Sequence, residues 1–166
     1  MLNRKLSIIS STIGDLLVKQ IAHELKNRNL YLSFANYFSI EGYTSLEKYY
    51  IKRAAEEDLH HTWISEYLAD GDYSYIYPLI DINTEKFEDC ITPFKQTVER
   101  EIQTTQLIYS IYEAAISEKD YMTASWLYEK LIQEQIEEEN ISRMALSIME
   151  SEGNNFTKGD KVLELL

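Results

Sequence analysis

The chain has 166 residues, of which 45% are hydrophobic, and only five are glycine and two proline. This length predicts a single domain with a sizeable core, and the scarcity of glycine and proline favours long helices over an all-β fold rich in tight turns. The formal net charge of −12 argues against nucleic acid or an anionic membrane as a partner, because both require a basic surface.

Neither a membrane anchor nor a disulfide is expected. No stretch approaches the roughly 20 apolar residues that cross a bilayer. The apolar run near the N-terminus is interrupted by serines and lacks the cleavage pattern of a signal peptide. The single cysteine, Cys90, has no intrachain partner, and one free thiol suits a reducing compartment. These features predict a soluble cytoplasmic protein.

The hydrophobic periodicity of the first half predicts two long helices. The first spans about 12–40 and ends at Gly42, and the second spans about 44–69. The segment Thr44-Ser45-Leu46-Glu47 has the pattern of a capping box that opens the second helix. The residues predicted to face inward are Leu17, Ile21, Glu24, Tyr31, Phe34 and Phe38 on the first helix and Leu46, Tyr50, Ala54, Glu57, His60, Ile64 and Leu68 on the second.

The second half predicts two more long helices after a long connection. Residues 73–91 have the length of a crossover from one end of a bundle to the other. Thr92-Pro93 is typical of a helix start, and the short turn near 117–120 predicts that the fourth helix is antiparallel to the third. The inward-facing residues are predicted to be Phe94, Val98, Glu101, Thr105, Ile108, Tyr112 and Ala115 on the third helix and Leu127, Leu131, Gln135, Glu138, Ser142, Ala145 and Met149 on the fourth.

The predicted architecture is therefore all-α. Four long helices over about 12–151 form a bundle with one long crossover between the second and third helices. A short fifth helix is predicted over about 157–166. The whole chain, 1–166, is predicted to be one domain.

Each of the four long helices carries a polar interruption near the middle of its apolar face. Glu57 and His60 are three residues apart and therefore project from the same side of the second helix. Burying an isolated carboxylate is costly, and facing carboxylates raise one another's pKa unless a cation lies among them. The interruptions are Glu24, Glu57 with His60, Glu101, and Gln135 with Glu138.

Carboxylates with one imidazole predict a site for iron or manganese, because a structural zinc site requires thiolates or several histidines. Glu57 is placed to bridge two ions, with Glu24 and His60 completing the first. The second ion would then be held by Glu101, Gln135 and Glu138. Any one of these glutamates taken alone is more typical of a salt-bridged core residue than of a ligand, and it is their coincidence at mid-length that favours a metal site.

The pattern resembles that of the bacterial non-haem ferritins over essentially the whole chain. The family has Glu on the first helix, Glu-x-x-His on the second, Glu on the third and Gln-x-x-Glu on the fourth. A second Glu-x-x-His, found in other ferritin-like di-iron bundles, is absent, which separates the chain from bacterioferritin and rubrerythrin. The second helix also has no methionine to ligate haem. The family pattern stands here as Glu24, Glu57-Asp58-Leu59-His60, Glu101 and Gln135-Ile136-Glu137-Glu138.

The resemblance implies iron storage and detoxification by a ferroxidase. Fe(II) would be oxidised by dioxygen or peroxide at a di-iron centre within each subunit and deposited as ferric mineral inside a 24-subunit cage. Two iron ions per subunit and no haem are implied. Tyr31 corresponds to a tyrosine beside the centre that acts as an electron donor, although a packing role fits its position equally well. A third iron position is implied at Glu56, Glu134 and Glu137 with Glu138 shared, whereas each of the first three alone has the pattern of a solvated helix-face charge.

Two other functions remain open at this level. A dimeric di-iron oxidase or peroxidase of the rubrerythrin type predicts a second histidine ligand on the fourth helix. A catalytically silent helical structural protein predicts that removing Glu57 and Glu101 together leaves iron oxidation unchanged.

Overall fold

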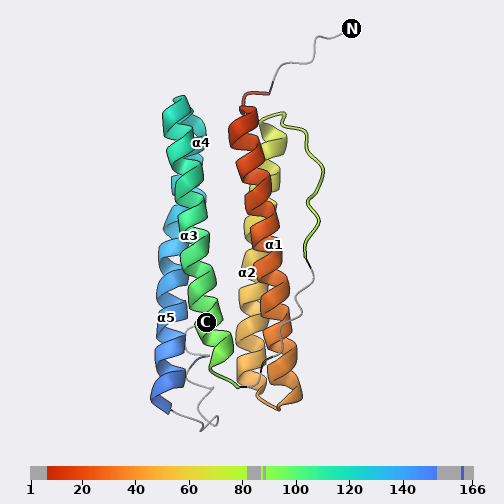
Figure 1. The fold of residues 1–166 in the computed structure, drawn as a ribbon, viewed down its shortest axis with the longest axis vertical. Helices are drawn as coiled ribbons and strands as arrows, with labels where there is room; N and C mark the ends of the chain where they lie inside the picture. The colour runs from red at the N-terminus through yellow and green to blue at the C-terminus, as the bar shows by residue number, and fades with distance from the viewer. Residues whose placement is uncertain (1–6, 82–86, 88, 153–161, 163–166) are drawn as a thin grey trace.

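Four long helical rods stand side by side in the computed structural model (Figure 1). The structure describes residues 7–81, 87, 89–152 and 162, and the regular secondary structure of these residues is helical. The predicted all-α bundle is thus confirmed. The rods are α1 (Ser11–Ile40), α2 (Thr44–Asp70), α3 (Thr92–Glu118) and a fourth made of α4 (Tyr121–Leu127), the π-helical turn η1 (Tyr128–Ile132) and α5 (Gln133–Glu152).

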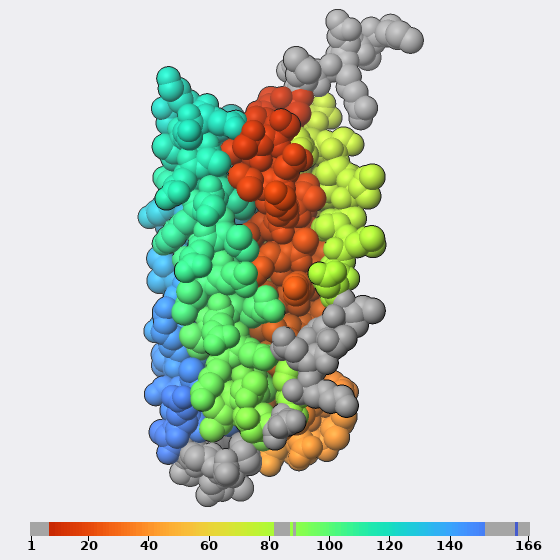
Figure 2. Space-filling view, viewed as in Figure 1, coloured from red at the N-terminus to blue at the C-terminus, as the bar shows by residue number. Residues whose placement is uncertain are grey.

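The rods form two antiparallel pairs, α1 with α2 and α3 with the fourth rod, and α1 also packs against α3. The described part of the connection after α2, residues 73–81, runs back along the outside of the first pair (Figures 1 and 2). As a result α3 starts at the same end of the bundle as α2 and runs parallel to it. The predicted long crossover is confirmed. None of the described helices is long and apolar enough to span a membrane.

The crossover is fixed to the start of α1 by a close aromatic contact. A Cβ atom on Gly14 would lie 2.2 Å from the ring of Tyr73, so a residue with a side chain does not fit there without displacing that ring. The Tyr73 hydroxyl donates a hydrogen bond to the Asp15 carboxylate at 2.8 Å. Gly14 therefore allows the crossover to lie directly against the helix.

The end of α1 and the start of α2 lie where the sequence predicts them, with one correction to the cap of α2. Gly42 has φ +82°, a conformation that glycine adopts without strain, and it follows the last turn of α1 as predicted. The predicted capping box at Thr44 is wrong in its register. Tyr43 is the N-cap, Thr44 is already helical, and the first turn is closed by the Glu47 N–H, which donates to the Tyr43 carbonyl at 3.0 Å.

The side chain that caps the start of α3 belongs to Asp89, which lies before the predicted start at Thr92. The Asp89 carboxylate accepts hydrogen bonds from the backbone N–H groups of Ile91 at 2.8 Å and Thr92 at 2.6 Å. Pro93 lies in the first turn, where its missing N–H costs nothing. The start at Thr92 is confirmed, but the side chain that satisfies the free N–H groups is that of Asp89.

The inward faces of α1, α2 and the fourth rod are those predicted, whereas the stripe of α3 is shifted by one residue at three positions. Thr97 and Thr104 are buried, while the neighbouring Val98 and Thr105 are half-buried. Each buried threonine donates its hydroxyl to a backbone carbonyl four residues earlier, at 2.8 Å and 2.9 Å respectively. The hydroxyl is thus satisfied within the helix itself, and burial costs little. The third shift buries Ile111 in place of Tyr112.

The fourth rod is not the continuous α-helix that was predicted. The π turn Tyr128–Ile132 interrupts it and ends three residues before Gln135. Such turns are rare and occur frequently at functional sites, because they change the direction in which the following side chains face. The short fifth helix predicted over about 157–166 lies outside the described residues except for Val162, which is helical and buried.

The apolar core is divided into two clusters, one toward each end of the bundle. The cluster around the start of α1 is mostly aliphatic, whereas the cluster around the end of α1 is rich in stacked aromatic rings. The polar interruptions predicted from the sequence lie between the two clusters. The apolar ends therefore hold the four helices at a spacing that leaves a buried polar layer in the middle.

Candidate metal centre

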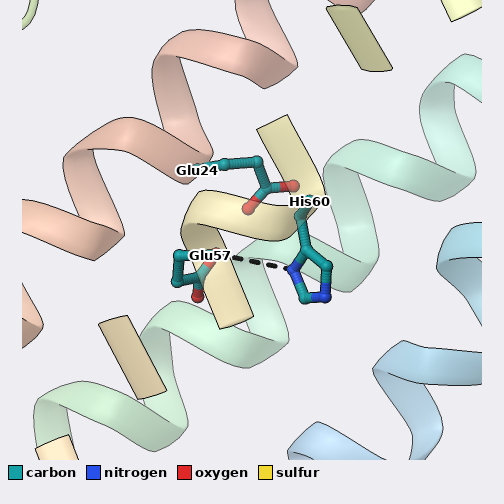
Figure 3. A group of neighbouring side chains, drawn as sticks. All are labelled: Glu24, Glu57 and His60. Atoms are coloured by element: carbon teal, nitrogen blue, oxygen red, sulfur yellow. Dashed lines mark ion pairs between the residues drawn. The ribbon is translucent and has the colours of Figure 1, made fainter. Parts of the chain in front are cut away.

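Three predicted ligands converge in this middle layer (Figure 3). Glu24 comes from α1, and Glu57 and His60 come from adjacent turns of α2. Each offers one ligand atom, these atoms lie within 4.8 Å of one another, and all three side chains are buried. Oxygen and imidazole ligands at this separation can bind one divalent cation such as Fe(II).

Neighbouring residues orient these ligands. The Gln20 side-chain amide, one turn before Glu24, donates to the Glu24 carboxylate at 2.7 Å. The His60 ring lies between two carboxylates, with Nδ1 3.7 Å from Glu57 and Nε2 3.6 Å from Glu138. Trp63 packs beside the ring, with the two ring centroids 5.4 Å apart. The ligands are thus held in place by the bundle.

Several buried carboxylate oxygens of the site have no hydrogen-bond partner. They are one oxygen of Glu24, both of Glu57 and both of Glu138, apart from a contact between the Glu24 and Glu57 carboxyl groups themselves. Buried polar atoms in proteins are nearly always paired, and an unpaired one costs about 1–3 kcal/mol. A cation among these oxygens supplies the missing interaction, so the donor set fits bound metal better than it fits a closed protein core.

The pKa values of these carboxyl groups are raised for the same reason. Burial, with the charge of Glu57 beside it, raises the pKa of Glu24 well above its ordinary value. Burial, with the charges of Glu101 and Glu138, does the same for Glu57. Burial raises the pKa of Glu138 to about 8. In the metal-free protein these groups retain protons near neutral pH, and a divalent cation must displace those protons when it binds.

Glu101, predicted as a ligand on α3, is in a different state because both of its oxygens are already paired. One accepts hydrogen bonds from the Tyr31 hydroxyl at 2.6 Å and from Arg53 at 2.9 Å, and the other from the Gln135 side-chain amide at 2.9 Å. Burial alone would raise the Glu101 pKa, but Arg53 and these hydrogen bonds outweigh it and hold the pKa below its usual value. Glu101 is therefore an anion even without metal.

Arg53 is the residue of the site that the sequence analysis missed. Its side chain is 2% exposed, forms ion pairs with Glu56 at 2.8 Å and Glu101 at 2.9 Å, and lies 3.5 Å from the Glu138 carboxyl group. The signal was present, because Arg53 precedes Glu57 by four residues and so lies on the same face of α2. A cation on the same face as buried carboxylates indicates an ion pair that stabilises them without metal.

The residues implied for a third iron position do not join the buried ligand group. Glu56 is half-buried and paired with Arg53, whereas Glu134 and Glu137 are exposed on α5. The third position stays a prediction. Tyr31 does lie beside the centre, through its hydrogen bond to Glu101, while its role as electron donor stays a prediction.

The other two histidines are bonded elsewhere. His23 Nε2 lies 2.7 Å from the Thr104 hydroxyl, and burial lowers the His23 pKa to about 4, which keeps the ring neutral. His61 lies 2.8 Å from the Tyr77 hydroxyl and 3.0 Å from the Asp58 carboxylate, at the surface near the crossover. His60 is thus the histidine of the centre.

A family model described as a ferritin-like domain matches residues 14–150, which include every side chain of the centre. The chain belongs to the ferritin family. This ferritin is 30% identical over 133 residues to the bacterial non-heme ferritin of Staphylococcus epidermidis, covering 80% of each chain. It is 28% identical over 134 residues to that of Staphylococcus aureus, covering 81% of this chain and 80% of the relative. The predicted resemblance is confirmed.

Solved structures show the same ferritin fold. An open pore ferritin from the archaeon Archaeoglobus fulgidus superposes with a TM-score of 0.88 at 22% identity, covering 93% of this chain and 98% of that one. A humanized archaeal ferritin gives the same TM-score at 23% identity, covering 93% and 97%. At these identities the structures support the arrangement of helices in this ferritin and nothing about its ligands.

We expect metal-free ferritin to become less stable as the pH rises from 6.5 to 8. Carboxyl groups whose folded-state pKa is raised bind more protons in the folded than in the unfolded state, and the stability they contribute is lost as the pH rises through that pKa. For Glu138 this pKa is about 8. The lowered pKa of His23 makes the stability rise with pH, but only below the ordinary histidine pKa of 6.5. Thermal unfolding with a chelator present measures the effect, and Glu138→Gln should flatten it. An unfolding temperature that rises between pH 6.5 and 8 contradicts the raised pKa values of these carboxyl groups.

Proposed function

We propose that this ferritin is an iron-storage ferroxidase. It oxidises Fe(II) at a centre within each subunit, using dioxygen or peroxide, and deposits the ferric product as mineral inside a homo-oligomeric cage of the 24-subunit type. The observation that carries the proposal is the buried group of Glu24, Glu57 and His60, in which one oxygen of Glu24 and both oxygens of Glu57 have no hydrogen-bond donor from outside the group. The identity to proteins named bacterial non-heme ferritin supports the same function.

The first Fe(II) ion would bind between Glu24, Glu57 and His60. Glu57 has two unpartnered oxygens and faces both this position and the second set of ligands, so it is placed to bridge to a second ion beside Glu138. Each Fe(II) loses one electron, and one dioxygen molecule accepts two electrons and two protons to give peroxide. The chain contributes ligands, fixed spacing and a site enclosed by apolar packing, rather than side-chain acid–base catalysis.

Exposed apolar side chains support assembly into an oligomer. On the crossover, Ile76 is 91% and Leu79 98% exposed, and Leu32 on α1 and Leu59 on α2 are also exposed. Large apolar side chains exposed to this extent are typical of contacts between subunits. We therefore propose that this outer side, seen in part in Figure 2, contacts another copy of the chain.

The two alternatives from the sequence have less support. A rubrerythrin-type oxidase needs a second histidine ligand on the fourth helix, whereas that rod contributes Gln135 and Glu138 and all three histidines of the chain precede residue 62. A structural protein without metal has no use for unpaired buried carboxylates, which are costly.

Aerobic addition of Fe(II) to the metal-free protein tests the proposal. We expect ferric absorbance to rise faster than in a protein-free blank, and the iron to co-elute with a high-mass species on size exclusion. Glu99→Gln removes one carboxylate from an exposed position of α3, away from the centre. This variant should behave as wild type. A species of one or two chains contradicts storage, and a rate equal to that of the blank contradicts ferroxidase activity.

A further inference from the structure

The two halves of the centre are not equivalent in the protein without metal. In the half formed by Glu24, Glu57 and His60, one oxygen of Glu24 and both of Glu57 have no hydrogen-bond donor from outside the group, and no arginine or lysine lies among the ligands. The half formed by Glu101 and Glu138 contains the guanidinium of Arg53. The first half is therefore ready for a cation, while the second already has one.

Glutamates from three helical elements hold the guanidinium in this second half. They are Glu56 on α2, Glu101 on α3 and Glu138 on α5. Glu101 also accepts hydrogen bonds from Tyr31 and Gln135, so three side chains already donate to its carboxylate while Arg53 remains in place. A divalent cation that binds to Glu101 must share this carboxylate with the charged guanidinium of Arg53.

Deprotonation offers no way to make room, because an arginine side chain stays charged in proteins. Its charge repels a divalent cation at close range, so the guanidinium has to move. Glu56 supplies a route, since its side chain is 28% exposed and already binds the other terminal nitrogen of Arg53. The guanidinium can turn toward Glu56 and solvent without losing every carboxylate partner.

We infer that Arg53 is a resident cation of the second metal position, which a divalent ion occupies only after displacing the guanidinium from Glu101 and Glu138. The inference rests on the proposed function and deepens it. The two ions of the centre bind in a fixed order, the first between Glu24, Glu57 and His60 and the second in competition with Arg53. Arg53 thereby weakens the second step and keeps Glu101 compensated when no metal is bound.

Binding of Zn²⁺, which is not oxidised, tests this inference apart from catalysis. Isothermal titration of the metal-free wild-type protein should show one tight buried ion per chain and a weaker second step. Arg53→Gln should tighten the second step by about tenfold or more, since a charge-assisted interaction no longer has to be broken. Arg53→Lys, which keeps the charge, should leave the second step weak. Arg28→Gln removes an exposed cation that pairs with Asp58 and is the matched control.

Crystals of the wild-type protein soaked in Zn²⁺ give a second readout that does not depend on whether Arg53→Gln folds. An ion between Glu24, Glu57 and His60 with Arg53 still on Glu101, or a second ion with Arg53 turned toward Glu56, supports the inference. Two bound ions with Arg53 still in contact with Glu101 and Glu138 overturn the inference. Equal second-step affinities in wild type and Arg53→Gln also overturn it. Both outcomes leave the proposed function intact. No ion at the first position overturns both.

Discussion

Replacing Glu57 with glutamine is expected to lower the initial rate of Fe(II) oxidation by at least about 100-fold, since even residues behind metal ligands change affinity or activity by 10–100-fold. Glu57 belongs to the first ligand group and is the carboxylate placed to bridge to the second ion. The amide cannot supply the negative charge that two cations share. Stopped-flow absorbance after mixing with aerobic buffer measures the rate.

The same variant should make the metal-free protein more stable. Glu57 is buried beside other carboxylates, and both of its oxygens lack a hydrogen-bond partner, so ionising it is costly. The gain should be larger at pH 8 than at pH 6.5, because an amide does not titrate. Glu99→Gln again provides the surface control. A variant that loses activity and also loses stability would indicate that Glu57 serves the fold and not the metal.

Opposite effects on activity and stability are expected wherever a residue is kept for its ligand chemistry. At such positions a polar residue stands where packing favours an apolar one. The stability lost there is offset by the rest of the fold or by the ligand. Here the two apolar clusters at the ends of the bundle supply the stability that the middle layer lacks.

The burial of the candidate ligands was predictable because helical periodicity is a strong signal in long helices. Glu24, Glu57 and Glu138 stand where an apolar residue is expected, and each was found buried. Such a violation is informative because an unpaired buried carboxylate is rare without a reason. The crossover was predictable from length alone, since a parallel neighbour cannot be reached by a short turn.

What the sequence did not predict depends on contacts between helices. The stripe of α3 was misplaced at Thr97 because hydrophobicity favoured the neighbouring Val98, whereas threonine can bury its hydroxyl against its own helix. At Thr104 the neighbour is also a threonine, so residue type could not distinguish the two positions. The π turn before Gln135 has no clear signature in the residues that form it. The position of Arg53 on the inward face of α2 could be read from the sequence, but its partners Glu101 and Glu138 come from other helices and could not.

Replacing Glu101 with alanine is expected to destabilise the metal-free protein by about 3–5 kcal/mol, the usual cost of removing one partner of a buried ion pair. The change leaves Arg53 with a buried charge and removes the acceptor for the Tyr31 hydroxyl. Glu101 and Glu57 belong to the same proposed centre, yet their substitution should change the free energy of unfolding in opposite directions. Denaturation by urea in the presence of a chelator measures both.

A double-mutant cycle identifies the cause of the Glu101 effect. If the uncompensated guanidinium is responsible, Arg53→Met in the Glu101→Ala background should recover most of the lost stability, because it removes the stranded charge and keeps apolar volume. If instead the cavity left by the glutamate is responsible, the second substitution should add its own cost. Recovery would show that Arg53 and Glu101 form one electrostatic unit. It follows that a metal ion at Glu101 must replace the stabilisation that Arg53 gives to this carboxylate. The net binding free energy of the ion at Glu101 is reduced by the same amount.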